Sequence, residues 1–315
     1  MTRTTLLGAL ALGVVACTTK ENTPAQDTTH RDTAAAQAAA APQQVGETSD
    51  LKTPESVRYD ADLDVFFISN VDGNPVQKDG NGAIRKVRAD SLGASTAFIE
   101  GGKNGVTLNA PKGMAIKGDT LWVADIDAVR AFNKRTGAPI ASIDLRPFKA
   151  TFLNDIAIGG DGDVYVTDTG ISFDAKGQIS HPGVNRIFKI VGKTATEAAK
   201  GDSIANPNGI TWDAANNRFL IATFAGNDVL AWTPGGAPTH VAAGPGQYDG
   251  IEVLGDGRIL VSSWADSSVH VIQNGKMTKL ITGVPAPADI GFDTKRNVVA
   301  VPEFTENKAV FFKLQ

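Results

Sequence analysis

The sequence predicts an all-β protein, a six-bladed β-propeller of four-stranded antiparallel blades that follows a low-complexity N-terminal segment. From Thr53 onward, short apolar stretches of strand length alternate with turns rich in Gly, Asp and Asn, and no long stretch has helical periodicity. One unit of this kind then occurs six times, and three of the five intervals between the units are near 40 residues, which is typical of propeller blades.

The N-terminal residues have the features of an export signal. Arg3 is followed by an apolar run over residues 6–16, which is too short to span a bilayer and ends in small residues before Cys17. The alternative, an N-terminal anchor helix, is disfavoured by that length. Cys17 is the only cysteine of the chain and therefore has no partner for an internal disulfide.

The position of Cys17 resembles a bacterial lipobox, in which the cysteine is lipidated. The resemblance implies a lipoprotein signal peptide over residues 1–16 and attachment to the membrane of the cell envelope through a lipid anchor. Thr18 stands where an Asp would favour the inner membrane, so we expect the outer membrane, on its periplasmic or surface side. Residues 17–50 are rich in Thr, Ala, Gln and Pro and predict a flexible tether, which leaves residues 51–315 for the propeller.

Charge excludes one class of partner. The formal net charge is −4 and the basic residues are scattered, unlike the clustered Lys and Arg of a nucleic-acid-binding surface. We expect a small-molecule substrate, no nucleic acid, and a monomer, since a single propeller has no need to oligomerise.

Each repeat opens with polar residues, continues into a strand and a turn, and ends in a second, stronger apolar strand. The units begin at Glu55, Lys112, Asn154, Asn208, Asp249 and Ala288, with spacings of 57, 42, 54, 41 and 39 residues. The longer spacings are explained by insertions in blade loops, one of them after Asp168. The last unit has only one further strand, so a segment within residues 45–52 is expected to complete it and close the ring.

In an antiparallel blade, the start of the first strand and the end of the second strand lie at the same end of the blade, and so on the same face of the propeller. The residues that open the units should therefore converge on the central axis. The residues that end the second strands should line the same opening and are candidate substrate-binding residues, among them Asn70, Asp125, Asp168, Trp264 and Phe304.

The predicted axial ring gathers two carboxylates and two amides: Glu55, Asn154, Asn208 and Asp249. Like charges in a buried site are costly unless a cation binds them, and oxygen ligands suit Ca²⁺. Zinc would need His or Cys, and none of the four histidines opens a repeat. The alternative is that these residues only start strands and bond to neighbouring backbone, as Asn and Asp do at turns.

Four motifs make the likeness specific: PES at Pro54, LNDI at Leu153, PNGI at Pro207 and YDGI at Tyr248. They resemble the calcium-ligand motifs of the SMP-30/gluconolactonase/LRE-like family and its paraoxonase and diisopropyl fluorophosphatase relatives. The resemblance covers the whole propeller and implies that Glu55, Asn154, Asn208 and Asp249 hold a catalytic Ca²⁺. It also implies hydrolysis of a lactone or small ester, with Asp249 or Glu55 as base or nucleophile and Asp155 beside the ligands.

Two departures from the family pattern stand out. Lys112 occupies the axial position where the paraoxonases have a catalytic His, and Phe304 falls near the rim His of the fluorophosphatase. Lys112 either stabilises a developing oxyanion beside the metal, as a catalytic residue, or neutralises Glu55 and Asp249 where no metal binds.

The leading interpretation is therefore an envelope-anchored Ca²⁺-dependent hydrolase of the gluconolactonase type. The alternative from another class is a non-catalytic propeller that binds a peptide, glycan or protein. A quinone-dependent sugar dehydrogenase is a third, although the sequence lacks a basic and aromatic set to anchor that cofactor.

Overall fold

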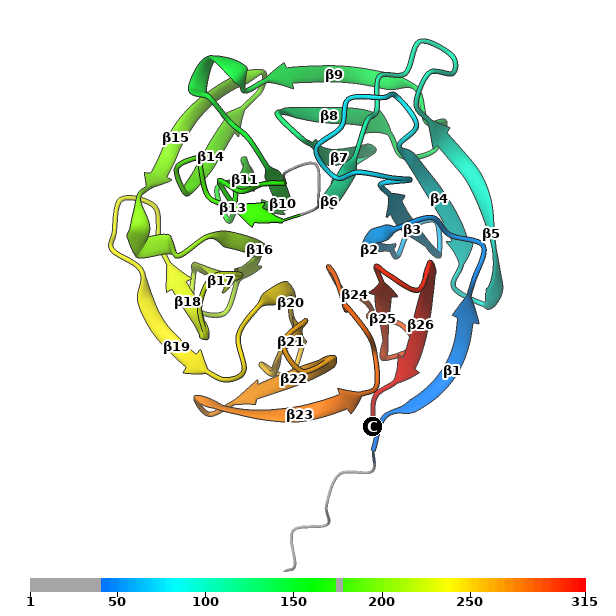
Figure 1. The fold of residues 1–315 in the computed structure, drawn as a ribbon. Helices are drawn as coiled ribbons and strands as arrows, with labels where there is room; N and C mark the ends of the chain where they lie inside the picture. Colours follow the sequence, from blue (N-terminus) through cyan, green and yellow to red (C-terminus); the bar gives the residue numbers. More distant parts are fainter. Residues whose placement is uncertain (1–40, 174–177) are drawn as a thin grey trace, which may run out of the picture. The chain divides into compact units, whose positions relative to one another are not determined.

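The computed structural model describes residues 41–173 and 178–315. Six four-stranded antiparallel sheets succeed one another in a ring around a central axis (Figure 1), so the predicted six-bladed propeller is confirmed. The expected tether residues 17–40 and the lipidation candidate Cys17 lie outside the described residues. Within the described part, no helix is long and apolar enough to cross a membrane.

Blades one to five are each built from four strands in chain order, with the first strand innermost (Figure 1). Blade one comprises β2 (Pro54–Asp60), β3 (Val65–Asn70), β4 (Ala83–Arg88) and β5 (Ser91–Glu100); blade two comprises β6 (Pro111–Lys117), β7 (Thr120–Asp125), β8 (Ala128–Asn133) and β9 (Pro139–Asp144). Blade three comprises β10 (Leu153–Ile158), β11 (Val164–Asp168), β14 (Arg186–Val191) and β15 (Thr194–Lys200). Blade four comprises β16 (Pro207–Asp213), β17 (Arg218–Thr223), β18 (Asp228–Trp232) and β19 (Thr239–Ala243); blade five comprises β20 (Tyr248–Val253), β21 (Ile259–Ser263), β22 (Ser268–Gln273) and β23 (Lys276–Thr282).

Blade six joins the two ends of the propeller. It contains β24 (Gly291–Asp293), β25 (Val298–Glu303) and β26 (Lys308–Lys313), and its outermost strand is β1 (Gln43–Thr48). β1 runs antiparallel to β26 and pairs Gln43 with Lys313 and Thr48 with Ala309. The predicted closure of the ring by an N-terminal segment is confirmed. The predicted domain boundary is corrected, because residues 43–48 belong to the propeller rather than to a tether.

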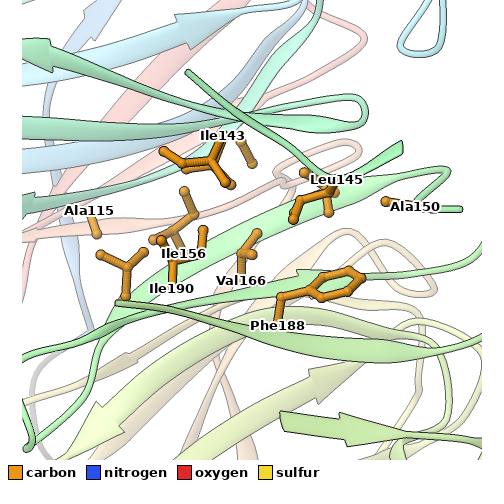
Figure 2. Packing of buried hydrophobic residues seen from close by; sticks show 12 residues of the cluster. Ala115, Ile143, Leu145, Ala150, Ile156, Val166, Phe188 and Ile190 are labelled. Atoms are coloured by element: carbon orange, nitrogen blue, oxygen red, sulfur yellow. The ribbon is translucent and has the colours of Figure 1, made fainter. Parts of the chain in front are cut away.

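Apolar side chains pack between neighbouring blades and form the core. Figure 2 shows one such interface, where Ala115 and Ile143 of blade two meet Ile156, Val166 and Phe188 of blade three. All five are at most 6% exposed. Equivalent clusters lie between the other blades. The second strands are therefore buried along most of their length, because both of their faces pack against neighbouring blades.

Two local features turn the opening residues of the repeats toward the axis. In β2, β6, β10, β16 and β20 the pairing with the second strand shifts register immediately after the first residue. Such a bulge re-aims a side chain, here the second residue of each strand. Glycine follows in several repeats because adjacent inner strands touch there: a Cβ on Gly209 would lie 2.2 Å from the carbonyl oxygen of Asp249.

A two-stranded hairpin is inserted between β11 and β14. It consists of β12 (Ser172–Phe173) and β13 (Ile179–Ser180), and it accounts for the longer third repeat. Two 3₁₀ turns, η1 (Arg146–Phe148) and η2 (Asp202–Ile204), complete the described structure.

Candidate active site

A cavity of about 270 Å³ lies at the axial opening, and we call it the axial cavity. The second residues of the five bulged inner strands line it: Glu55, Lys112, Asn154, Asn208 and Asp249. Trp264 and Phe304, two of the residues that follow second strands, line it as well. The repeats therefore bring together the residues that the sequence pattern aligned. Ala288, which opens the sixth repeat, does not line this cavity.

Buried polar oxygens lie in this cavity without partners. Oε2 of Glu55, Oδ1 of Asn208 and Oδ1 of Asp249 have no hydrogen-bond donor. Each of the three residues is at most 5% exposed. Leaving a buried acceptor unpaired typically costs about 1–3 kcal/mol, and more for a charged group. Three such acceptors from three blades fit a group that binds oxygen, and Asn154 adds a fourth oxygen-bearing side chain to the same cavity.

Two of these side chains, Asp249 and Asn154, are held in place by hydrogen bonds. The indole Nε1 of Trp264 donates to Oδ2 of Asp249 at 2.8 Å. The amide Nδ2 of Asn154 donates to Oγ1 of Thr169 at 3.0 Å, and that hydroxyl in turn donates to the carbonyl oxygen of Pro207 at 2.9 Å. The side chains of Asp249 and Asn154 are thus oriented by a hydrogen bond to one of their two polar atoms.

Burial and neighbouring negative charges raise the pKa of both cavity carboxylates. Burial, and then the charge of Asp249, raise the pKa of Glu55 well above its ordinary value, while Lys112 opposes the shift. Burial and then Asp289 raise the pKa of Asp249 in the same way. A cation bound between the two carboxylates would oppose these shifts and favour the ionised form of both groups.

Lys112 is 1% exposed and does not supply that charge by direct contact. Its Nζ donates to the carbonyl oxygens of Pro75, at 3.0 Å, and Ala110, at 3.1 Å, and lies 4.3 Å from the ring centre of Phe152. In the described part of the chain it forms no ion pair. Burial lowers the pKa of Lys112 to about 8, against the opposing pull of Glu55 and Asp125.

A cation in this cavity would need amide oxygens as well as carboxylates. In residues 41–173 and 178–315 there is no group of three or more His, Cys, Asp or Glu side chains arranged to hold a metal. The axial set, with two carboxylates and two amides, has the chemistry of a hard-cation site rather than a zinc site. The three described histidines, His181, His240 and His270, all lie outside the cavity lining.

Three of the candidate substrate-binding residues lie outside the lining of the axial cavity. Asn70, Asp125 and Asp168 end their second strands as predicted but do not line the axial cavity. Instead they bind nearby backbone. Oδ1 of Asn70 accepts from the amide of Lys52 at 2.7 Å, and Oδ1 of Asp125 accepts from the amide of Ala110 at 2.9 Å. Oδ1 of Asp168 accepts from the amide of Phe152 at 2.9 Å.

Asp155, which was expected beside the axial ligands, also lies outside the lining of the axial cavity. Its Oδ2 accepts from the amide of Ile210 at 2.8 Å, and its Oδ1 lies 3.6 Å from Nη2 of Arg58. It belongs to a second group of charges, which we call the axial ion cluster: Arg58, Asp155, Glu252 and Asp289. Nη2 of Arg58 lies 3.0 Å from Oδ2 of Asp289, and Nη1 contacts Glu252.

The sequence pattern missed the axial ion cluster because Arg58 and Glu252 lie within strands that alternate polar and apolar residues. That alternation does not distinguish a side chain facing the axis from one facing solvent. The pattern also missed apolar lining residues that have no repeat register: Pro75, Phe152 and Ile171 in connections, and Phe173 and Ile179 in an inserted hairpin. Phe224 follows a second strand, as Trp264 and Phe304 do, and the repeat pattern does place it at the opening.

Comparisons with known proteins agree with the propeller fold. Residues 53–293 match the model of the family described as SMP-30/Gluconolactonase/LRE-like region. A search of the curated proteins finds no match.

Solved structures share the fold at low sequence identity. A gluconolactonase of Xanthomonas campestris superposes with a TM-score of 0.62 at 14% identity, covering 88% of this chain and 95% of that one. A streptogramin B lyase superposes with a TM-score of 0.58 at 14% identity, covering 87% and 97%. A catalytically inactive virginiamycin B lyase of Staphylococcus aureus, solved with quinupristin, gives 0.58 at 15% identity, covering 87% and 99%.

Proposed function

Because the chain belongs to the SMP-30/gluconolactonase/LRE-like family, we propose that it is a Ca²⁺-dependent hydrolase of a lactone or related small ester. The observation that carries the proposal is the set of unpaired, buried oxygens on Glu55, Asn208 and Asp249 in one cavity. Family membership and the gluconolactonase among the structural neighbours support the reaction class.

The four axial residues fit a calcium ion by their chemistry. Ca²⁺ takes six to eight oxygen ligands in flexible geometry, and waters or substrate complete the shell. Glu55, Asn154, Asn208 and Asp249 would hold it. When bound, the ion would stabilise negative charge on the substrate oxygen during attack.

The side chains of the cavity have separable roles. Asp249 or Glu55 accepts the proton of the attacking water or attacks the carbonyl carbon itself, because these are the carboxylates that line the cavity. Trp264 holds the carboxylate of Asp249 through one oxygen and leaves the other free. Asn154 is oriented through Thr169.

Lys112 contributes a fixed positive charge to the cavity wall. Its ammonium is bound by two backbone carbonyls and is held against Phe152, so it cannot swing to pair with a carboxylate without losing those contacts. We assign it to electrostatic stabilisation of the oxyanion, in preference to direct neutralisation of Glu55 and Asp249.

We also propose that the propeller is attached to the cell envelope through a lipid on Cys17. Cys17→Ser should release the protein from the membrane fraction and abolish incorporation of labelled palmitate. A protein that stays with the membrane after this substitution would refute the lipid anchor while leaving the hydrolase untouched.

The proposed function is tested by calorimetric titration of Ca²⁺ into the full chain, followed by a screen of lactones and small esters. We expect one binding site and metal-dependent turnover, with affinity lowered more than about tenfold in Asp249→Asn. Asp228→Asn is the matched control, because Asp228 begins β18, pairs with His240 and lies outside the cavity. A full chain that binds no Ca²⁺ and hydrolyses no lactone or ester would overturn the proposal in favour of a binding propeller.

A further inference from the structure

The lining of the axial cavity divides by chemistry and by position in the fold. Its charged and amide residues come from the inner strands β2, β6, β10, β16 and β20. Its apolar residues come mainly from connections between strands, and we call them the apolar wall: Pro75, Phe152, Ile171, Phe173, Ile179, Phe224, Trp264 and Phe304.

Aromatic rings make up most of the apolar wall and touch one another. The ring centres of Phe224 and Trp264 are 6.1 Å apart, and those of Trp264 and Phe304 are 5.5 Å apart. Phe152 and Phe173 form a second pair at 5.8 Å. Such rings offer a large apolar contact area at fixed positions.

The hairpin β12–β13 turns an apolar face to the cavity. Phe173 and Ile179 are directly paired across the two strands, so their side chains lie on the same side of the hairpin. Both line the cavity, whereas the other pair, Ser172 and Ser180, alternates to the opposite side. Ile179 is 46% exposed, so an apolar surface at the cavity edge is available to a ligand.

Few polar groups of the cavity remain for a substrate's hydroxyl groups. The hydroxyl of Thr169 and the indole N–H of Trp264 already have partners, and Nζ of Lys112 binds two carbonyls. The free oxygens of Glu55, Asn208 and Asp249 are those assigned to the cation. A polyhydroxylated ligand would bury hydroxyls against aromatic rings without compensation, which is unfavourable.

We infer that the substrate of this cavity is a lactone or ester bearing an alkyl or aryl group, and not a sugar lactone, with Phe173 and Ile179 as specificity-determining residues. The part of the inference that concerns hydrolysis rests on the proposed function. The apolar selectivity of the cavity stands on the lining alone.

Three δ-lactones with the same six-membered ring test the inference on the full chain with Ca²⁺: unsubstituted δ-valerolactone, δ-decalactone with its pentyl chain, and glucono-δ-lactone. Each buried methylene is worth about 0.8 kcal/mol, roughly a threefold to fourfold gain in kcat/KM. We expect δ-decalactone to exceed δ-valerolactone by more than about tenfold, and glucono-δ-lactone to be the poorest substrate. Glucono-δ-lactone hydrolysed as well as δ-valerolactone, or better, would overturn the inference.

Two isoleucines of similar exposure supply a matched pair of variants. Ile179→Ser should lower the ratio of kcat/KM for δ-decalactone over δ-valerolactone by about threefold to tenfold. Ile140→Ser, on the outer strand β9 with 49% exposure against 46% for Ile179, should leave that ratio unchanged. Equal ratios in the two variants would remove Ile179 from the specificity surface.

Binding of 2-pentylcyclohexanone separates this inference from the proposed function, because the ketone has a ring and a chain but no hydrolysable bond. Calorimetric binding of the ketone, without binding of sorbitol, would support the apolar cavity even if every lactone were inert, and only the hydrolase would fail. Turnover of lactones without preference, together with no binding of the ketone, would overturn the inference and leave the hydrolase standing.

Discussion

The indole nitrogen of Trp264 donates a 2.8 Å hydrogen bond to one oxygen of Asp249, and the other oxygen of that carboxylate is buried and unpaired. Trp264 begins the connection after β21, whereas Asp249 is the second residue of β20 in the same blade. One side chain that also forms part of the apolar wall therefore orients a predicted metal ligand.

Trp264→Phe tests this relationship by removing the donor and keeping an aromatic ring. A hydrogen bond to a charged group contributes about 1.5–3 kcal/mol. We expect calcium affinity, measured by calorimetry, to fall by roughly tenfold to 100-fold. Trp212→Phe is the control, since Trp212 packs against Phe219 in blade four and does not line the cavity. Equal calcium affinity in the two variants would contradict an orienting role.

Asp249→Asn should stabilise the protein in chelator. The folded pKa of Asp249 is raised by burial and by Asp289, so its contribution to stability is fully present below the unfolded value near 3.8 and is lost as pH rises through the folded pKa. At pH 8 without metal, the amide should raise Tm by several degrees, because 1 kcal/mol corresponds to about 2–4 °C in a domain of this type.

In the wild type, Ca²⁺ should raise Tm at pH 8, and in Asp249→Asn this effect should be small. Thermal melting with and without chelator at pH 5.5 and pH 8 measures both quantities. A variant that melts below the wild type in chelator at pH 8 would show that Asp249 is already compensated without a metal.

Lys112 should give the reaction an upper pH limit. Its pKa is lowered to about 8 by burial, so the ammonium is present below that pH and is lost as pH rises through it. We expect kcat/KM, corrected for spontaneous lactone hydrolysis, to fall above pH 8. Lys112→Met should reduce kcat/KM by about tenfold at pH 7 and remove this limb of the profile. A wild-type rate that is flat from pH 7 to pH 9.5 would contradict the assignment.

Arg58→Met should strongly destabilise the propeller. Arg58 contacts Asp155, Glu252 and Asp289, and it also donates from Nε to the carbonyl oxygen of Met114 at 2.8 Å. Removing one partner of a buried ion pair costs about 3–5 kcal/mol, since the other charges remain buried. Urea unfolding should reveal this loss. Arg85→Met, on blade one with its exposed partner Asp50, should cost less than about 1 kcal/mol.

The repeat pattern predicted the blade count and the convergence of the inner strands, because strand length and turn chemistry are local properties. It also predicted that Glu55, Asn154, Asn208 and Asp249 would share one site. Their common register places them equivalently in four blades, and a bulge at that register turns each side chain toward the axis. Asp289 escaped prediction because β24 begins two residues later, at Gly291, without such a bulge.

The remaining site residues depend on contacts that a sequence pattern does not encode. Asp125 and Asp168 end second strands just as Asn70 does, yet all three turn to backbone amides of the preceding connection. The residue type alone does not show whether an Asp at a strand end binds a ligand or accepts a hydrogen bond from nearby backbone. Phe173 and Ile179 belong to an insertion present in one blade only, so no repeat could align them.

The pairing of β1 with β26 also means that blade six is the last blade to form. Blades one to five use strands that follow one another in the chain, so each can form as soon as its own residues are available. Blade six instead needs β1 and β26, which are far apart in the chain, and it pairs Gln43 with Lys313. Contacts between such distant residues form slowly because a long loop must close. The edge of β1 therefore stays unpaired until β26 has been synthesised, and a chain that stops before Lys308 leaves β1 without its partner strand.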